Sequence, residues 1–255
     1  MLRKRIFFTL IYSDGYFHQS RNFRLQRVGN LEWLKKNYNF SKTARSIDEL
    51  VILNASRGKK NIDEFSNVVR DTIDEVFIPV TCGGGVKNLS DASKLFNNGA
   101  DKILMNSCLY RDPGVINEIA SVYGAQCVVA SVDYKNIDNE FIAFSNNGSK
   151  NELSAIDHIN SLEGYNYGEI FLNSIDQDGT GFGYDFSILD SLKNLQNPII
   201  FSGGAGNFEH FLEGFETRKL QALSTANLLN FVGDGLDKSR SKLISNGMNL
   251  ADWRY

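Results

Sequence analysis

Short apolar segments alternate along the whole chain with segments whose apolar residues recur every three or four positions. Short apolar segments are typical of buried strands, and the three-to-four spacing is typical of helices with one buried face. The expected strands cover residues 5–12, 49–53, 79–82, 103–106, 127–132, 169–172, 198–202 and 220–225. The expected helices cover residues 31–38, 62–73, 90–98, 113–124, 154–162, 186–195, 208–215 and 238–245. Residues 15–29 are expected to form a long loop, and residues 133–150 a polar stretch with a small hairpin.

Strict alternation of strands and helices implies parallel pairing, and eight such units imply a closed barrel. We therefore expect an α/β fold, a single (β/α)8 TIM barrel, with residues 1–255 as one domain. The length of 255 residues and the hydrophobic content of 42% suit one large soluble domain.

Two glycine-rich turns stand at matching places about half a chain apart. Residues 83–85 (GGG) follow the third expected strand, and residues 203–206 (GGAG) follow the seventh, each before a helix. Glycines leave backbone N–H groups open to a ligand, and a helix N-terminus favours an anion. The pattern predicts two phosphate sites that face each other. The alternative is that the glycines only allow tight packing of strand against helix.

Polar residues gather at the carboxyl ends of the expected strands, where the active sites of barrels lie. They are Asn106, Ser107, Asp133, Asn173, Asp178, Gly179, Thr180, Ser202 and Asn227. Asp133 and Asp178 follow neighbouring strands, and two carboxyl groups placed there suit acid–base chemistry. The alternative for both aspartates is a structural role, in which they cap the following helix or hold a loop.

Composition narrows the possible functions. The net charge of −3 and the pI near 5.7 give no general attraction to nucleic acid or to an anionic membrane. No apolar run is long enough to span a bilayer. Cys82, Cys108 and Cys127 form no C-x-x-C pair, so we expect no disulfide, no zinc or other metal site and no cofactor. A reducing cytoplasm fits this cysteine usage.

With these residues in view, the chain resembles the HisF family, the cyclase subunit of imidazole glycerol phosphate synthase. The resemblance spans nearly the whole chain and is most specific in MLRKRI, EVFIPVTCGGGVKNLSDASKLFNNGADKILMNS, YGAQCVVASVDYK, GEIFLNSIDQDGTGFGYD and SGGAGNFEHF. It implies a barrel of two half-barrel repeats, a lyase role in histidine biosynthesis, a glutaminase (HisH-like) partner and a phosphorylated substrate. The implied phosphate-binding positions are Gly85, Asn106 and Ser107 on one half and Asp178, Gly179, Gly204 and Asn227 on the other.

The catalytic pair of the family is only half present. The resemblance implies catalytic aspartates on strands one and five; the second matches Asp133, but the first falls on Ile11, which cannot exchange a proton. The family's substrate-binding lysine falls on Gln19, and its strand-two aspartate falls on Asn54. Loss of one of two cooperating carboxylates typically removes orders of magnitude of rate, so these changes predict impaired imidazole-forming cyclisation.

The opposite mouth of the barrel keeps its charges. The resemblance implies a ring of four residues that gates ammonia arriving from the glutaminase, and the matching residues are Arg5, Glu49, Lys102 and Glu169. Each stands at the start of an expected strand. Asp101 matches a residue of the glutaminase-facing surface. The alternative is a ring of salt bridges that only stabilises the barrel.

This combination resembles divergent members of the family found with surface-polysaccharide (lipopolysaccharide) genes. The expected function is that of a subunit in a glutamine amidotransferase complex, with an ammonia channel through the barrel. The ammonia would reach a separate ATP-using enzyme that converts a sugar acetamido group to an acetamidino group. One alternative is an ordinary histidine-pathway cyclase that uses Asp14 as its second carboxylate. Another is a non-catalytic activator of the glutaminase.

Overall fold

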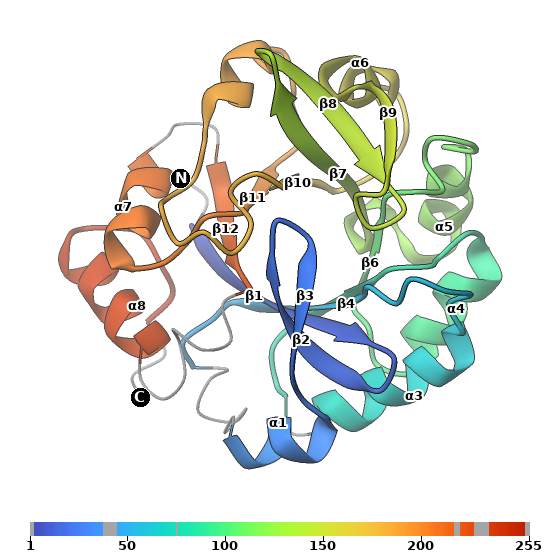
Figure 1. Ribbon diagram of the computed structural model, residues 1–255, viewed down its shortest axis with the longest axis horizontal. Coiled ribbons are helices and arrows are strands. Elements are labelled where there is room, and N and C mark those ends of the chain that lie inside the picture. Colours follow the sequence, from blue (N-terminus) through green and yellow to red (C-terminus); the bar gives the residue numbers. More distant parts are fainter. Residues whose placement is uncertain (1–2, 38–44, 75, 217–219, 227–234, 253–255) are drawn as a thin grey trace.

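Eight parallel strands close into a barrel, which confirms the expected architecture. The structure, a computed structural model, describes residues 3–37, 45–74, 76–216, 220–226 and 235–252 (Figure 1). Around the barrel the order is β1–β4–β5–β6–β7–β10–β11–β12, and β12 pairs with β1 in parallel. The barrel strands are β1 (Arg5–Ser13), β4 (Glu49–Asn54), β5 (Val80–Gly83), β6 (Lys102–Met105), β7 (Val128–Ile137), β10 (Glu169–Ser174), β11 (Ile199–Ser202) and β12 (Leu220–Thr225).

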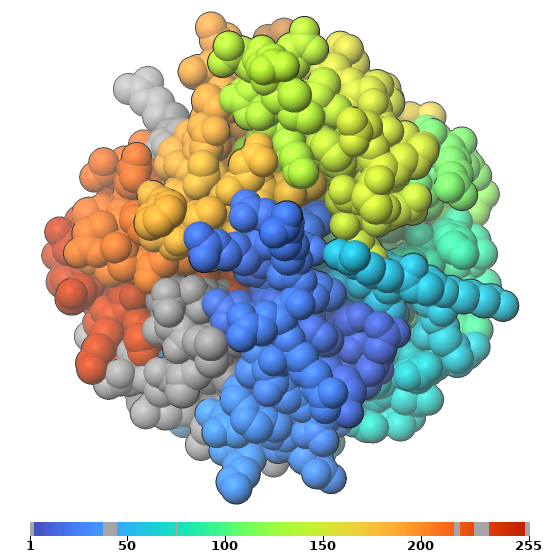
Figure 2. All heavy atoms as spheres, viewed as in Figure 1, coloured from blue at the N-terminus to red at the C-terminus, as the bar shows by residue number. Residues whose placement is uncertain are grey.

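The segment expected to be a long loop is instead an antiparallel hairpin. It consists of β2 (Tyr16–Arg21) and β3 (Arg24–Gly29), and β2 also pairs with β1. Asn22 and Phe23 form its two-residue turn with φ angles of +50° and +62°. Two successive positive φ angles match the twist of a hairpin, although Asn-Gly is the usual sequence for such a turn. In Figure 1 the hairpin lies over the centre of the barrel, and Figure 2 shows its atoms covering the middle of this face.

Helices surround the strands and bury one face each. They are α1 (Leu31–Asn37), α3 (Ile62–Ile73), α4 (Leu89–Asn97), α5 (Val115–Tyr123), α6 (Ala155–Ser161), α7 (Phe208–Glu216) and α8 (Gly235–Ser245). A short 3₁₀ helix, η1 (Ala125–Cys127), precedes β7. Helix α5 begins two residues later than expected, at Val115, and Asp112 accepts a hydrogen bond from the backbone N–H of Gly114 (3.1 Å) just before it.

The prediction of an α-helix over residues 186–195 is wrong. This segment forms a short 3₁₀ helix, η2 (Ser187–Ser191), followed by turns. The backbone N–H groups of Leu189, Leu192 and Leu195 each bond to the carbonyl three residues earlier, at 2.9, 3.1 and 3.2 Å. Apolar residues recur here every three positions, which is the repeat of a 3₁₀ helix.

Both halves of the barrel carry the same additional feature. Strand β7 continues past the barrel into an antiparallel meander with β8 (Glu140–Ser145) and β9 (Lys150–Ser154), as β1 continues into β2 and β3. Ile11 pairs with Leu53 of β4, and Asp133 pairs with Asn173 of β10. Ile11 and Asp133 therefore occupy equivalent places in the two halves.

Two apolar layers hold the barrel together. The larger one lies between the strands and the surrounding helices. The smaller one fills the inside of the barrel with Phe7, Val51, Leu104, Val129, Phe171, Ile200 and Ala222. A filled interior is usual for a barrel of eight strands. None of the helices among the described residues is both long and apolar enough to cross a membrane.

Candidate functional site

A cavity of about 930 Å³ opens at the carboxyl ends of the strands. Its wall includes five of the expected site residues: Gly85, Asn106, Ser107, Asp133 and Asp178. Ile11 also lines the cavity, so an apolar side chain stands at the position where the resemblance implies a carboxylate. Asp14 is exposed and bonded to Ser13 and Ser56, and it does not line the cavity, so its position does not favour it as a replacement.

Asp133 is held in the cavity wall by two amide side chains. Asn106 donates to one carboxylate oxygen at 2.6 Å, and Asn173 donates to the other at 3.1 Å. Burial raises the pKa of Asp133 to about 6, although the two amide hydrogen bonds and the charge of Lys60 act in the opposite direction. A carboxyl group with a pKa near neutrality can both accept and return a proton, which general acid–base chemistry requires.

Lys60 also lines this cavity, although a short basic run such as residues 57–60 (RGKK) is usually solvated surface. Its ammonium donates to the carbonyl oxygen of Asn54 at 2.6 Å and to the side-chain oxygen of Asn147 at 3.2 Å. Asn147 comes from the β8–β9 turn and is itself held by the carbonyls of Ala55 and Ser56, at 3.0 and 3.2 Å. Burial lowers the pKa of Lys60 to about 8 against the attraction of Asp133. Loops after barrel strands often carry functional residues, and the place of Lys60 in the loop after β4 is the feature of the sequence that could have indicated its role.

A small niche of about 20 Å³ adjoins the main cavity on the other half of the barrel. The expected residues Asp178, Gly179 and Gly204 line it together with Gln19. Asp178 accepts a hydrogen bond from the hydroxyl of Ser20 at 2.5 Å and another from the backbone of Phe23 at 3.0 Å. Burial raises the pKa of Asp178. These bonds tie the β2–β3 hairpin to the loop after β10, which favours the structural alternative for Asp178. The expected residue Asn227 lies outside the described residues.

The glycines at both turns are required by close packing. A β-carbon on Gly84 would come within 2.2 Å of the carbonyl oxygen of Asn54, and one on Gly204 within 1.8 Å of the carbonyl oxygen of Gly183. One on Gly85 would meet the stem of Lys60 at 3.0 Å. The packing alternative therefore has direct structural support, and it is compatible with a ligand in the cavity next to Gly85.

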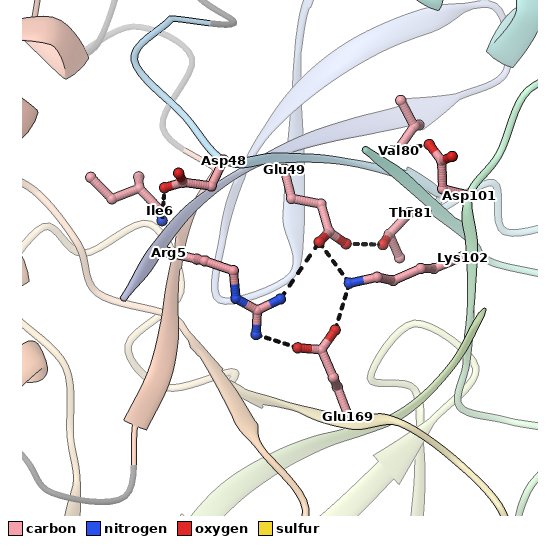
Figure 3. Close-up of polar contacts among 9 residues, drawn as sticks. All are labelled: Arg5, Ile6, Asp48, Glu49, Val80, Thr81, Asp101, Lys102 and Glu169. Carbon is pink, nitrogen blue, oxygen red and sulfur yellow. Dashed lines mark hydrogen bonds and ion pairs between the residues drawn. The ribbon is translucent and has the colours of Figure 1, made fainter. Parts of the chain in front are cut away.

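The four expected ring residues meet at the opposite end of the barrel (Figure 3). Lys102 donates to Glu49 at 2.7 Å and to Glu169 at 2.6 Å. Arg5 bonds to Glu169 and lies 3.9 Å from Glu49. Each is the first residue of its strand, so the ring lies at the amino-terminal mouth. Two positive and two negative charges alternate, and each charge contacts both residues of opposite sign.

Electrostatics favours the charged forms of Lys102 and Glu169 in this ring, whereas burial raises the pKa of Glu49 in spite of its bonds to Lys102 and Thr81. Burial by itself lowers the pKa of Lys102, but the carboxylates of Glu49 and Glu169 outweigh burial and raise the pKa above its ordinary value. For Glu169, burial acts to raise the pKa, and the hydrogen bond and charges from Arg5 and Lys102 outweigh it. The charged ends of Arg5 and Lys102 also face the aromatic side chain of Phe7. They lie 5.2 and 6.0 Å from the centre of its phenyl group.

Two aspartates beside the ring hold neighbouring strand ends in register. Asp48 accepts from the backbone N–H of Ile6 at 2.8 Å, and Asp101 accepts from that of Val80 at 2.8 Å (Figure 3). Each directly precedes a ring residue, so these bonds fix the backbone from which Glu49 and Lys102 project. Asp101, the expected partner contact, is exposed at this mouth.

Among the described residues, no group of three or more His, Cys, Asp or Glu side chains is arranged to hold a metal ion. Cys82, Cys108 and Cys127 are free cysteines that form no disulfide. Burial raises the pKa of the Cys82 thiol and raises that of Cys108 to about 11.

Comparison with known proteins places the chain in a family. The model of the histidine biosynthesis protein family matches residues 30–231. A putative imidazole glycerol phosphate synthase subunit hisF2 from Parasynechococcus marenigrum (strain WH8102) is 43% identical over 256 residues, covering 99% of this chain and 95% of the relative. HisF subunits of the same synthase from Flavobacterium johnsoniae and Thermotoga sp. (strain RQ2) are 35% and 36% identical over 253 residues. These matches cover 98% of this chain and 99% and 98% of the relatives. By the family match and by near full-length identity above 30%, this chain belongs to the histidine biosynthesis protein family, with HisF subunits among its relatives.

Proposed function

We propose that this chain is the HisF-type barrel subunit of a glutamine amidotransferase complex, and that ammonia from a glutaminase partner enters through the ring of Arg5, Glu49, Lys102 and Glu169. The observation that carries the proposal is this ring, which closes the amino-terminal mouth with charges that satisfy one another. We further propose that residues 1–255 act as one barrel domain in the cytoplasm.

The physical properties of the barrel suit neutral ammonia better than ammonium. Beyond the ring lies the apolar layer around Phe7, Val51 and Leu104, and an ion loses far more than a neutral molecule on entering such surroundings. The layer is well packed, so passage requires side chains to move briefly, as core side chains do when they exchange rotamers. The exposed Asp101, at the same mouth, is proposed to face the glutaminase.

The upper cavity supports an outcome other than imidazole formation. The position equivalent to Asp133 in the other half of the barrel is occupied by Ile11, so Asp133 has no second carboxylate opposite it there. With one proton-exchanging carboxyl group where the family uses two, the barrel is proposed to pass ammonia on to a separate ATP-using enzyme. That enzyme would convert an acetamido group of a surface-polysaccharide sugar to an acetamidino group.

A cyclase subunit of histidine biosynthesis is the second candidate. It is favoured by the names of the relatives and by Asp133, whose pKa near 6 suits proton transfer. Turnover of the ribonucleotide substrate with ammonium salt separates the two candidates. The primary proposal expects turnover orders of magnitude below that of a family cyclase assayed in parallel. Comparable rates would establish the cyclase instead.

Isolation of the complex tests the primary proposal. A tagged chain expressed in its own host is expected to bring down a glutaminase and an ATP-using enzyme, with glutamine-dependent amidation of an acetamido sugar in the purified material. Lys102→Met serves as the matched variant for transfer, and Lys94→Met as its control, since Lys94 pairs with Asp63 on the surface at 2.7 Å. Recovery of the chain without a glutaminase would refute the proposal.

A further inference from the structure

The upper cavity carries an excess of positive charge on one side. Among the described residues, six basic ones line it against three acidic ones, in a chain whose net charge is −3. The basic residues are Arg24, Arg57, Lys59, Lys60, Lys87 and Arg111, and the acidic ones are Asp112, Asp133 and Asp178. The basic residues come from the β2–β3 hairpin and from the loops after β4, β5 and β6. The described residues of the small niche on the other half include no basic side chain. A concave site with one sign of charge draws ligands of the opposite sign.

Lys60 differs from the other five basic residues in its surroundings. The side chains of Arg57, Lys59 and Lys87 are exposed, as are Arg24 and Arg111, whereas Lys60 is partly buried. A charge in a partly buried site is screened less by water and salt, so it interacts more strongly with a ligand than an exposed charge does. The exposed residues can attract an anion from solution, and Lys60 is placed to bind it.

The position of Lys60 is also fixed before any ligand arrives. Its stem packs over Gly85, where a β-carbon would lie 3.0 Å from the lysine Cδ. Its ammonium has two partners among the described residues, Asn54 and Asn147. An ammonium has three N–H donors, so one donor is left for a ligand beyond these two contacts. Neither hydrogen-bond partner carries a charge, so a bound anion would add a direct charged contact to the attraction that Asp133 exerts on Lys60.

We propose that Lys60 is an anion-binding residue, and that it holds the phosphate-class group of the cavity's ligand beside Gly85, Asn106 and Ser107. This inference goes beyond the proposed ammonia conduit and rests on the upper cavity alone. It assigns the anionic end of the ligand to the β4–β5–β6 side of the barrel. The Lys60 ammonium supplies a cation to a half-barrel whose other expected phosphate contacts are uncharged.

Binding of inorganic phosphate and of ribose 5-phosphate by the purified chain tests the assignment. Titration calorimetry at pH 7 and low salt is expected to give saturable binding that Lys60→Met weakens at least tenfold. Methionine keeps a stem over Gly85 and removes only the charge. Lys94→Met is the matched control, because Lys94 pairs with Asp63 on the surface at 2.7 Å and does not line the cavity, and it should change the affinity less than twofold. Absence of saturable binding to the parent chain, an unchanged affinity in Lys60→Met, or an equal loss in both variants would overturn the proposal.

A second measurement uses the unaltered chain, in case Lys60→Met folds poorly. Limited acetylation followed by mass spectrometry reports the reactivity of each lysine. Phosphate is expected to protect Lys60 severalfold while Lys94, a surface lysine outside the cavity, keeps its reactivity. Equal protection of both lysines, or of neither, would count against Lys60 as the binding residue. Neither measurement involves glutamine or ammonia, so a negative result here leaves the conduit proposal to its own test.

Discussion

Asp48 and Arg240 form a two-pronged ion pair with N–O distances of 2.7 and 2.8 Å, and the two side chains are only 9% and 4% exposed. The pair ties α8 to the start of β4, one residue from the charged ring. The same guanidinium also bonds to the carbonyl oxygen of Ala251 at 2.7 and 2.9 Å. Arg240 thus joins the C-terminal segment to the amino-terminal mouth of the barrel.

Removal of this arginine should destabilise the barrel strongly. Arg240→Met leaves the Asp48 carboxylate buried without its partner, and we expect a loss of about 3–5 kcal/mol in the free energy of unfolding. Urea unfolding followed by circular dichroism measures this loss. Arg70→Met is the control, because Arg70 pairs with Asp71 on the exposed surface and should contribute less than about 1 kcal/mol. Similar values for the two variants would contradict this account.

Gly204 should tolerate no side chain. Its φ angle is +111°, and a β-carbon would lie 1.8 Å from the carbonyl oxygen of Gly183. Gly204→Ala is expected to cost at least about 1–3 kcal/mol from backbone strain, and more if the backbone has to move. Gly58→Ala has open space around it and should change stability by less than about 1 kcal/mol. Thermal unfolding of both variants distinguishes these cases, and a Gly204→Ala variant as stable as the parent would rule out the close approach.

Asp133 should titrate near pH 6, well above an ordinary aspartate. Because its folded-state pKa lies above its unfolded-state pKa, ionisation weakens stability as pH rises from about 4 to about 6. Carbon NMR of labelled aspartate measures the pKa directly. Lys60 attracts the carboxylate and lowers this pKa, so Lys60→Met is expected to raise it further. An unchanged pKa in that variant would mean that the two groups do not interact.

A carboxyl group at position 11 should be unfavourable in this chain. Ile11 is only 9% exposed and lies in the cavity that also contains Asp133. Ile11→Asp is expected to lower stability by about 1–3 kcal/mol, more at pH 8 than at pH 5, because a desolvated carboxylate has a raised pKa and ionises at a cost. Ile11→Leu is the control. Urea unfolding at both pH values measures the effect, and a pH-independent change would show that charge is not the cause.

The barrel could be predicted from sequence because each of its strands is a buried apolar run and each run alternates with a helical pattern. The hairpin of β2 and β3 could not be predicted, because apolar and polar residues do not alternate regularly over residues 16–29. Its turn is Asn22-Phe23 instead of a glycine-containing pair. The 3₁₀ helix η2 was hidden by a three-residue apolar period that is easily mistaken for the helical one.

The site could be predicted where it depends on strand ends and not where it depends on loops. Asn106 follows β6, and Asp133 and Asn173 pair where β7 and β10 leave the barrel, so their meeting at one mouth follows from the fold. Lys60 and Asn147 are 87 residues apart, and they meet because the β8–β9 turn folds over the loop after β4. The spacing of apolar and polar residues along the chain does not predict a contact between two loops such as this one.

The ring can be tested by measuring where the nitrogen of glutamine goes. In the reconstituted complex, Lys102→Met removes both hydrogen bonds of Lys102, to Glu49 and Glu169. We expect glutamine hydrolysis to continue, amidated product per glutamine to fall several-fold, and released ammonium to rise accordingly. Amidation from added ammonium salt should remain at the parent level, and Lys94→Met should behave as the parent. An unchanged yield of product per glutamine in Lys102→Met would contradict the passage of ammonia through this mouth.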